Sequence, residues 1–406
     1  MLTRTMEDTL RRAVRTFPAI LVTGPRQSGK TTLLKMAWGR THRFVPLENP
    51  DIRARVIADP VGFLRENHPP VILDEIQYVP ELLPYIKTAI DENRSPGMWL
   101  LTGSQSFSLM QGISESLAGR VAVVTLLPLS VGEAAGMGGK SPSLAGLLSR
   151  LRAGDEATAH PSFDMADWLL RGTYPEVRAN PEVDRDLWCA GYVQTYLERD
   201  VRQVVNVGDL NAFHRFLRLL AARTGQVVNY SDLARDVGVS APTARKWVSV
   251  LEASGQVYLL PPYFRNFGKR LIKSPKAYWL DTSIAAFLMG LHAREPLLHG
   301  PFLGPLFETA VVSGWVKAFH NRGIPPALYF WRSRDGIEVD LLVDYNGKLH
   351  PIEIKATSTV IPQHAAALNK WGGLAGTSVE PAVIVADIPG ALSVSPGVRA
   401  VPWWWL

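Results

Sequence analysis

The 406-residue sequence contains a single cysteine, Cys189. This excludes an intramolecular disulfide framework and a zinc site built from clustered cysteines. No run of about 18 apolar residues occurs, which excludes an ordinary transmembrane helix. The first residues, MLTRTMEDTLRRAV, lack the apolar stretch of a secretory signal peptide. The histidines form no HxxxH-type pair that would indicate a metal site. We therefore expect a soluble, cytoplasmic protein.

The composition is that of folded domains, with 47% hydrophobic and 20% charged residues. The length predicts two to four domains. Lysine and arginine (43) exceed aspartate and glutamate (37), which leaves a formal charge of +6. This surplus is small for the length and only weakly favours an anionic partner.

The first 130 residues alternate short apolar runs with amphipathic, helix-like segments. The apolar runs are 19–24, 70–75, 98–104 and 121–129. Continuous apolar runs between helices predict a parallel sheet covered on both faces, and hence an α/β nucleotide-binding fold. Residues 132–165 are rich in Gly, Ser and Ala and predict a connection with a short helix at 145–153 that is not a core element.

The first run leads into GPRQSGKTT, a full match to GxxxxGK[ST] between a strand and a helix. The glycines let the backbone wrap closely around phosphates, whose charge the N–H groups at the helix N-terminus attract. Lys30 is expected to reach the terminal phosphates, and the Thr31 hydroxyl to ligate Mg²⁺. The residues predicted to bind nucleotide in this loop are Gly24, Pro25, Arg26, Gln27, Ser28, Gly29, Lys30, Thr31 and Thr32.

Two later strands end in polar residues that fit the same site. VILDE ends in Asp74, predicted to hold the Mg²⁺ shell, and Glu75, predicted to polarise the attacking water. The alternative is a buried strand that ends in a solvated acidic turn. LLTGSQS predicts that Ser104 or Gln105 senses the γ-phosphate, although any buried strand can end in such a turn.

The order of several motifs resembles a large prokaryotic family of AAA-superfamily ATPases, the AAA_14 plus DUF4143 type. The motifs are GPRQSGKTTL, VILDEIQ, LLTGSQSF, ESLAGRV, LLPLSVGE, GTYPEV, YLERDV, FETAVV, EVDLLVD, PIEIKA and VPWWWL. The resemblance implies ATP and Mg²⁺ as cofactors. It also implies Arg120 as an arginine that acts on the γ-phosphate, in the same or a neighbouring subunit, and Arg199 as a sensor from the lid. Both arginines could equally form surface ion pairs.

Residues 227–263 have the pattern of a helix-turn-helix followed by a strand. Gly238 permits the tight turn, and Ser240 can cap the second helix. That helix directs Arg245 and Lys246 outward, and a basic loop follows with Lys269, Arg270 and Lys273. This winged-helix pattern predicts DNA contact by these five residues. The alternative is a packing or subunit-contact module with ordinary solvated charges.

The last third carries carboxylates whose spacing predicts a cluster. Glu353 and Lys355 share one face of a strand, Asp340 lies on a neighbouring antiparallel strand, and Glu308 lies on a preceding helix. The arrangement resembles the PD-(D/E)xK nuclease fold, in which Asp340 and Glu353 would hold a metal and all four residues would be catalytic. A half-exposed strand with alternating charges would look similar, and such a fold can also hold DNA without cutting it. The WWW sequence at 403–405 predicts a buried edge strand or interface.

The predicted fold is α/β with four parts. They are a P-loop AAA-type ATPase (1–160), a helical lid (161–222), a winged helix (223–298) and a restriction-endonuclease-like domain (299–406). The predicted function is an ATP-hydrolysing, DNA-acting protein. Two alternatives remain: an ATPase that recognises DNA structure with an inert nuclease-like domain, and a nucleotide-switched regulator of protein partners. DNA is the expected partner, a membrane is not, and the sequence is compatible with a homo-oligomer.

Overall fold

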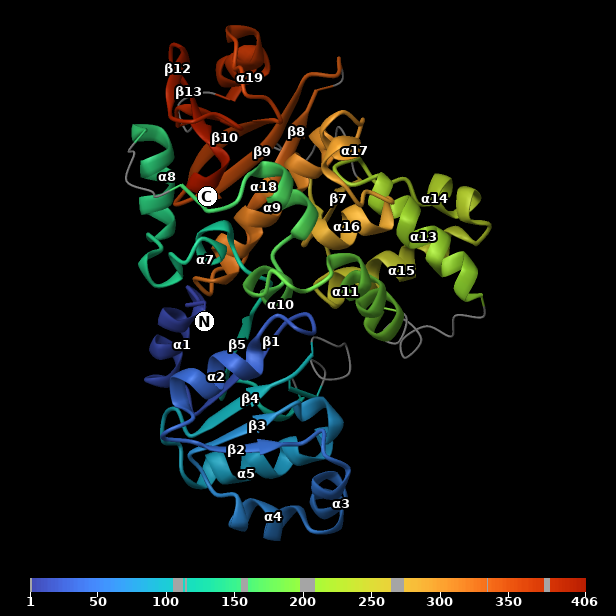
Figure 1. Ribbon diagram of the computed structural model, residues 1–406. Coiled ribbons are helices and arrows are strands. Elements are labelled where there is room, and N and C mark those ends of the chain that lie inside the picture. Colours follow the sequence, from blue (N-terminus) through green and yellow to red (C-terminus); the bar gives the residue numbers. More distant parts are fainter. Residues whose placement is uncertain are drawn as a thin grey trace.

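The computed structural model has an N-terminal sheet, a middle region of helices and a C-terminal sheet (Figure 1). The structure describes residues 2–104, 112–113, 115–154, 160–197, 209–263, 274–333, 335–375 and 380–406. Five residues with predicted roles lie outside these ranges: Gln105, Arg199, Lys269, Arg270 and Lys273.

The N-terminal sheet has five parallel strands in the order β2-β3-β4-β1-β5. Its strands are β1 (Ala19–Thr23), β2 (Arg43–Pro46), β3 (Val71–Asp74), β4 (Trp99–Thr102) and β5 (Val121–Thr125). The four apolar runs are thus confirmed as strands, and their parallel pairing is confirmed too. The strand β2 was not predicted, because its short sequence RFVP begins with an exposed arginine and lies at the edge of the sheet.

Helices cover both faces of this sheet, as predicted. They are α1 (Met6–Val14), α2 (Lys30–Trp38), α3 (Pro50–Ala58), α4 (Pro60–Glu66) and α5 (Leu83–Glu92). Ile20 and Val22 of β1 pack with α1 and α2, whereas Ala19 and Leu21 pack with the other three helices. This alternation follows from the two-residue period of a strand, and it explains why all of β1 is apolar.

The prediction that residues 132–165 hold no core element is wrong. They contain most of α7 (Val131–Ala134) and all of α8 (Leu144–Ala153). Four leucines of α8 are buried in the largest apolar core: Leu144, Leu147, Leu148 and Leu151. Their spacing is that of one helix face, which outweighs the Gly- and Ser-rich composition around it.

The middle region contains mostly short helices. They are α9 (Met165–Arg171), α10 (Pro175–Ala179), α11 (Arg185–Tyr192), α13 (Leu210–Ala222), α14 (Tyr230–Val237), α15 (Ala241–Ala253), α16 (Thr282–Leu288) and α17 (Arg294–Leu298). Gly238 ends α14 with φ +84°, and the Ser240 hydroxyl accepts a hydrogen bond from Thr243 N (3.2 Å), as the sequence predicted. The strands β6 (Val257–Leu260) and β7 (Lys276–Trp279) pair antiparallel.

The C-terminal part contains helices and a six-stranded sheet in the order β12-β13-β11-β10-β9-β8. It comprises α18 (Leu303–His320), β8 (Leu328–Arg332), β9 (Glu338–Tyr345), β10 (Lys348–Lys355), α19 (Ala366–Ala375), β11 (Ala382–Ala386), β12 (Leu392–Ser395) and β13 (Val398–Pro402). The sequence predicts a helix at 303–320 and a strand at 338–345, and α18 and β9 confirm these bounds; it does not predict β12. β10 pairs antiparallel with β9 and parallel with β11. Residues 403–405 form a buried 3-10 turn, not the predicted strand.

The middle and C-terminal parts are joined closely. Tyr263 N donates to Phe330 O (2.7 Å), and Phe330 N donates to Pro261 O (3.1 Å), so the chain after β6 runs along the edge strand β8. One apolar core extends from Leu127 to Trp405 and includes residues of both parts. No helix in the described part of the chain is long and apolar enough to cross a membrane.

Candidate functional site

The loop between β1 and α2 has the backbone that the glycines in its sequence predict. Gly24 has φ +137°, and a Cβ atom there would lie 2.2 Å from Leu126 O at the end of β5, so only glycine fits. Gly29 has φ +93° and begins α2. Lys30 is buried, and its Nζ donates to the carbonyls of Gly24 (3.2 Å) and Pro25 (2.8 Å). The loop therefore encloses its own lysine at the N-terminus of α2.

The Thr31 hydroxyl and Asp74 lie together at the carboxyl end of the sheet. Thr31 Oγ1 donates to Asp74 Oδ1 (2.7 Å), and Thr102 Oγ1 donates to the same oxygen (2.6 Å). Burial raises the pKa of Asp74, although the two hydroxyl hydrogen bonds oppose this shift. These oxygens form a small donor set of the kind that a hard cation prefers.

Glu75 has a left-handed backbone, with φ +61°. Such a conformation is uncommon for a residue other than glycine, and it marks functional sites when the surroundings enforce it. Here the Glu75 N–H donates to Thr102 Oγ1 (2.9 Å), and the Glu75 carboxylate accepts a hydrogen bond from the Gln77 side chain. Gln77, which the sequence did not single out, thereby fixes the direction of this carboxylate.

Ser104 lies beyond the end of β4, close to Gln77. Its N–H donates to Gln77 Oε1 (3.2 Å), and its hydroxyl is buried. The Ser104 backbone thus belongs to the hydrogen-bond network that holds Glu75. Ser104 does not line the cavity described next.

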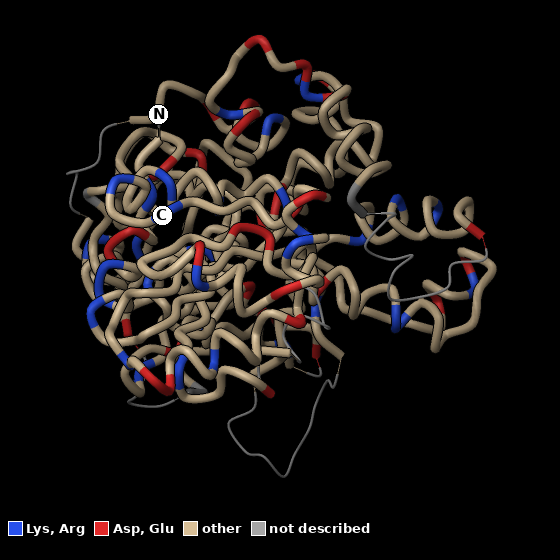
Figure 2. The backbone as a smooth tube through the Cα atoms, turned by 90° about the horizontal axis from the view of Figure 1, so that it is seen from below, with Lys and Arg blue, Asp and Glu red and all other residues tan. Residues whose placement is uncertain are grey.

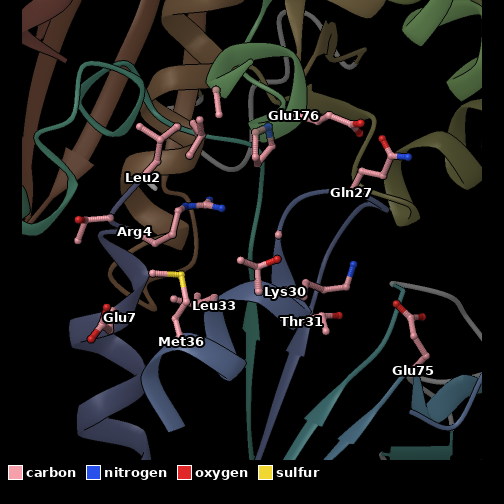
Figure 3. Close-up of a pocket in the computed structure, with 16 residues that line it drawn as sticks. Leu2, Arg4, Glu7, Gln27, Lys30, Thr31, Leu33, Met36, Glu75 and Glu176 are labelled. Atoms are coloured by element: carbon pink, nitrogen blue, oxygen red, sulfur yellow. The ribbon is translucent and has the colours of Figure 1, made fainter. Parts of the chain in front are cut away.

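A cavity of about 560 Å³ adjoins the loop, a size that suits a small-molecule ligand. Figure 3 shows Lys30, Thr31 and Glu75 around one end, and Leu2, Glu7 and Met36 at the other. The lining residues are Leu2, Thr3, Arg4, Glu7, Gln27, Gly29, Lys30, Thr31, Thr32, Leu33, Met36, Glu75, Leu129, Pro175, Glu176 and Ala179. The end near the loop is polar, and the other end combines the apolar side chains of Leu2 and Met36 with the charged Arg4 and Glu7 (Figure 3).

Arg4 lines this cavity and was missed by the sequence reasoning. It donates to Ser28 O in the loop (2.7 Å) and to Leu127 O beyond β5 (2.6 Å), and it forms an ion pair with buried Glu133 (3.2 Å). Its position depends on residues more than 100 positions away, so no local pattern could have revealed it. Glu176 of α10 lines the same cavity from the middle region.

Arg120 lies at the end of the sheet where the parallel strands begin, whereas the loop lies at the end where they finish. It immediately precedes β5, where Ala19 N at the start of β1 donates to its carbonyl (3.2 Å). Its guanidinium forms a bidentate ion pair with Asp91 (2.6 and 2.9 Å). Arg120 therefore does not reach the cavity of its own chain, which contradicts a role within one subunit; a role toward a neighbouring subunit stays a prediction.

The structure brings the four predicted C-terminal residues into one cluster. Lys355 Nζ lies 2.6 Å from Glu353 Oε1 and 3.7 Å from Asp340 Oδ2. Asp340 also accepts from Ile354 N (2.8 Å). Burial raises the pKa of Asp340 and raises that of Glu353 to about 7. Glu308 approaches from α18, and burial raises its pKa too. Each of these buried carboxylates is therefore costly to ionise unless a positive charge lies beside it.

Three further residues belong to this cluster and were not predicted. Lys276 of β7 lies 3.1 Å from Glu308 Oε1 and forms an ion pair with Glu338. Tyr278 donates its hydroxyl to Glu308 Oε1 (2.5 Å). Lys276 comes from the middle region, 64 residues from Asp340, and only the tertiary fold could reveal it.

The cluster does not fit the metal that the nuclease resemblance implies. Within the described ranges, no group of three or more His, Cys, Asp or Glu residues is arranged to hold a metal ion. Besides Lys355 of the motif itself, a second ammonium, that of Lys276, contacts Glu308 and Glu338 in this cluster.

The predicted DNA-binding residues of α15 are exposed. Lys246 faces solvent, and the Arg245 guanidinium, also exposed, lies over the Tyr230 ring of α14 (4.9 Å). Figure 2 shows basic and acidic residues interspersed along the chain. The attraction of α15 for an anion such as DNA would therefore come from Arg245 and Lys246 themselves.

A glycine-rich loop on a parallel sheet, with a threonine and a strand-end aspartate beside it, defines the class of P-loop nucleotide-binding proteins. A family model described as an AAA domain matches residues 16–135. Two domains of unknown function match later segments, DUF8612 at 162–295 and DUF4143 at 303–406. The chain thus carries an AAA-type ATPase domain followed by these two domains.

Relatives of similar sequence are known from mycobacteria. The uncharacterized proteins Mb2031c of Mycobacterium bovis and Rv2008c of Mycobacterium tuberculosis are each 34% identical over 351 residues, covering 86% of this chain and 73% of theirs. The chain belongs to the family of these two proteins.

Solved structures resemble it more distantly. A Walker-type ATPase of Pyrococcus abyssi is 16% identical over 70% of this chain and 94% of its own, with a TM-score of 0.45. Thermotoga maritima RuvB T158V is 19% identical over 63% of this chain and 86% of its own, with a TM-score of 0.30.

Proposed function

We propose that this protein is a Mg²⁺-dependent ATPase that acts on DNA. The observation that carries the ATPase proposal is the convergence of Lys30, Thr31 and Glu75 on one cavity, with Asp74 bonded to Thr31. The end of the cavity near the loop suits a triphosphate, and the apolar side chains of Leu2 and Met36 at the other end suit a nucleobase.

The residues around Thr31 fit the cation that accompanies a nucleoside triphosphate. Thr31 Oγ1 and Asp74 would hold Mg²⁺, which when bound supplies positive charge against the phosphate oxygens. When a nucleotide binds, the Lys30 ammonium would donate to phosphate oxygens instead of to the carbonyls of Gly24 and Pro25. Glu75, oriented by Gln77, would accept a hydrogen bond from the attacking water and so orient it.

Nucleotide binding tests the first half of the proposal. Lys30→Ala should lose ATP binding, because the phosphates lose their compact cationic partner. Arg40→Ala is a control just beyond the same helix, since Arg40 is exposed and does not line the cavity. Equal ATP affinity in Lys30→Ala and the parent, measured by calorimetry, would refute the assignment.

The DNA half rests on α14, α15 and the C-terminal sheet. The exposed Arg245 and Lys246 are on the second of two helices joined by a tight turn, which is the position of a recognition helix. The succession α18-β8-β9-β10-α19-β11 resembles the nuclease-like fold expected from the sequence. The Lys276 ammonium, which lies outside the nuclease motif and contacts Glu308 and Glu338, favours the version in which this domain holds DNA without cutting it.

One panel separates the candidate functions. Purified protein is mixed with single-stranded, duplex, forked and branched DNA, with and without ATP and Mg²⁺, and both binding and cutting are scored. We expect salt-sensitive binding and no cutting. If the parent cuts DNA and Asp340→Ala does not, the function in which the C-terminal domain is a nuclease is supported instead. The regulator of protein partners gains support if no DNA binds under any condition.

A further inference from the structure

Lys276 is a buried cation that enters the acidic cluster from outside the C-terminal part. It is only 4% exposed, and its backbone lies in β7 of the middle region. Its ammonium contacts Glu308 and Glu338, and it lies over the Phe330 ring (5.5 Å). A lysine side chain is rarely buried unless it is paired, so these contacts account for its position.

The cluster divides its charges between two ammonium groups. Glu308 and Glu338 contact Lys276, whereas Glu353 and Asp340 contact Lys355. Four carboxylates thus face two lysines and the Arg332 guanidinium, which lies 3.6 Å from Glu338. Glu353 is 5% exposed, and its Oε2 has no hydrogen-bond partner among the described residues. The cluster therefore retains one unsatisfied buried acceptor beside the lysines.

We propose that the Lys276 ammonium is a built-in counter-ion that occupies the acidic cluster in place of a divalent cation. The side chain is tethered, so its effective concentration at the cluster is high and no cation from solution is required. A lysine ammonium is a compact point charge that donates up to three hydrogen bonds, so it can bridge carboxylates from two different elements.

This assignment has a consequence for how the parts are held together. Lys276 ties β7 to α18 through Glu308 and to β9 through Glu338. Tyr278, two residues along the same strand and therefore on the same face, adds a second bond to Glu308. The inference does not depend on ATP hydrolysis or DNA binding, because none of these residues lines the nucleotide cavity.

The test is to remove the ammonium and to measure the binding of Mn²⁺ alone, without nucleotide, by electron paramagnetic resonance. Lys276→Met keeps the length and apolar body of the side chain but removes the ammonium from Glu308 and Glu338; Glu338 keeps only the Arg332 guanidinium, 3.6 Å away. We expect it to bind one more Mn²⁺ per chain than the parent, and Lys276→Met with Glu308→Gln to lose this gain. A folded Lys276→Met that gains no Mn²⁺ would overturn the proposal.

Two controls make the result specific. Lys348→Met removes an exposed ammonium that pairs with Glu380 in the same domain, and it should add no Mn²⁺ site. The parent and Asp340→Asn should bind the same number of Mn²⁺ ions, a comparison that serves even if Lys276→Met fails to fold. Mn²⁺ that the parent binds and Asp340→Asn loses would show that a divalent cation already enters the cluster, and the proposal would fail.

Discussion

At the scale of single residues, the nucleotide site depends on shared hydroxyl groups. Thr102 donates to Asp74 and accepts from the N–H of Glu75, so one side chain holds both acids of the VILDE motif. Lysine, threonine and both acids of this site were predictable, because the loop pattern and the strand end are local features of the sequence. Thr102 was not, since its role depends on the pairing of β4 with β3.

Thr102→Val should weaken both the fold and the site. The substitution preserves shape but leaves the buried Asp74 carboxylate with one donor fewer and the Glu75 N–H without its acceptor. We expect the free energy of unfolding to fall by about 1–3 kcal/mol, measured by urea titration, together with slower ATP turnover. Thr88→Val, on the exposed face of α5, is the control. An unchanged stability and turnover rate would show that this hydroxyl is dispensable.

His350 provides a prediction about pH. It is 7% exposed, Nδ1 has no hydrogen-bond partner in the described part of the chain, and burial lowers its pKa to about 4. Between pH about 4 and 6.5 the unfolded chain therefore binds more protons than the folded chain, so acidification should lower the free energy of unfolding by roughly 2 kcal/mol. His350→Phe should flatten this dependence in urea titrations; equal slopes in both proteins would contradict it.

At the scale of helices and strands, elements with a strong apolar period were predicted correctly. Residue composition alone led to the wrong prediction for α8. The bounds of α18 follow from its long apolar pattern, and α14 and α15 follow from their cap residues. The core role of α8 was missed because its short leucine face is surrounded by glycine and serine. The strand β2 was missed because an edge strand needs little apolar sequence.

The helix α15 carries a prediction about DNA. Arg245→Gln with Lys246→Gln should reduce affinity for duplex DNA across sequences. Each lost phosphate contact should reduce the log–log salt slope by roughly 0.9. Arg40→Gln with Arg65→Gln removes two exposed charges far from α15 and is the matched control. Fluorescence anisotropy at several salt concentrations measures this, and a slope equal to that of the control would remove α15 from the interface. The same measurement applies to Lys269, Arg270 and Lys273 of the predicted basic loop.

At the scale of the whole molecule, α18 lies between the nucleotide site and the C-terminal cluster. Asn321, directly after α18, donates to Glu133 (3.5 Å), and Glu133 pairs with Arg4 beside the loop. Earlier in the same helix, Glu308 contacts Lys276. These contacts join residues up to 188 positions apart. Sequence patterns could indicate the separate sites but not the helix that connects them.

The account's central claim is that Glu75 activates water at a nucleotide site built by Lys30, Thr31 and Asp74. The most direct test compares ATP binding and Mg²⁺-dependent hydrolysis in the parent and in Glu75→Gln. The substitution removes the negative charge that orients the water but leaves the phosphate loop intact, so ATP should bind with parental affinity while turnover is lost. Hydrolysis by Glu75→Gln at the parental rate would contradict the claim.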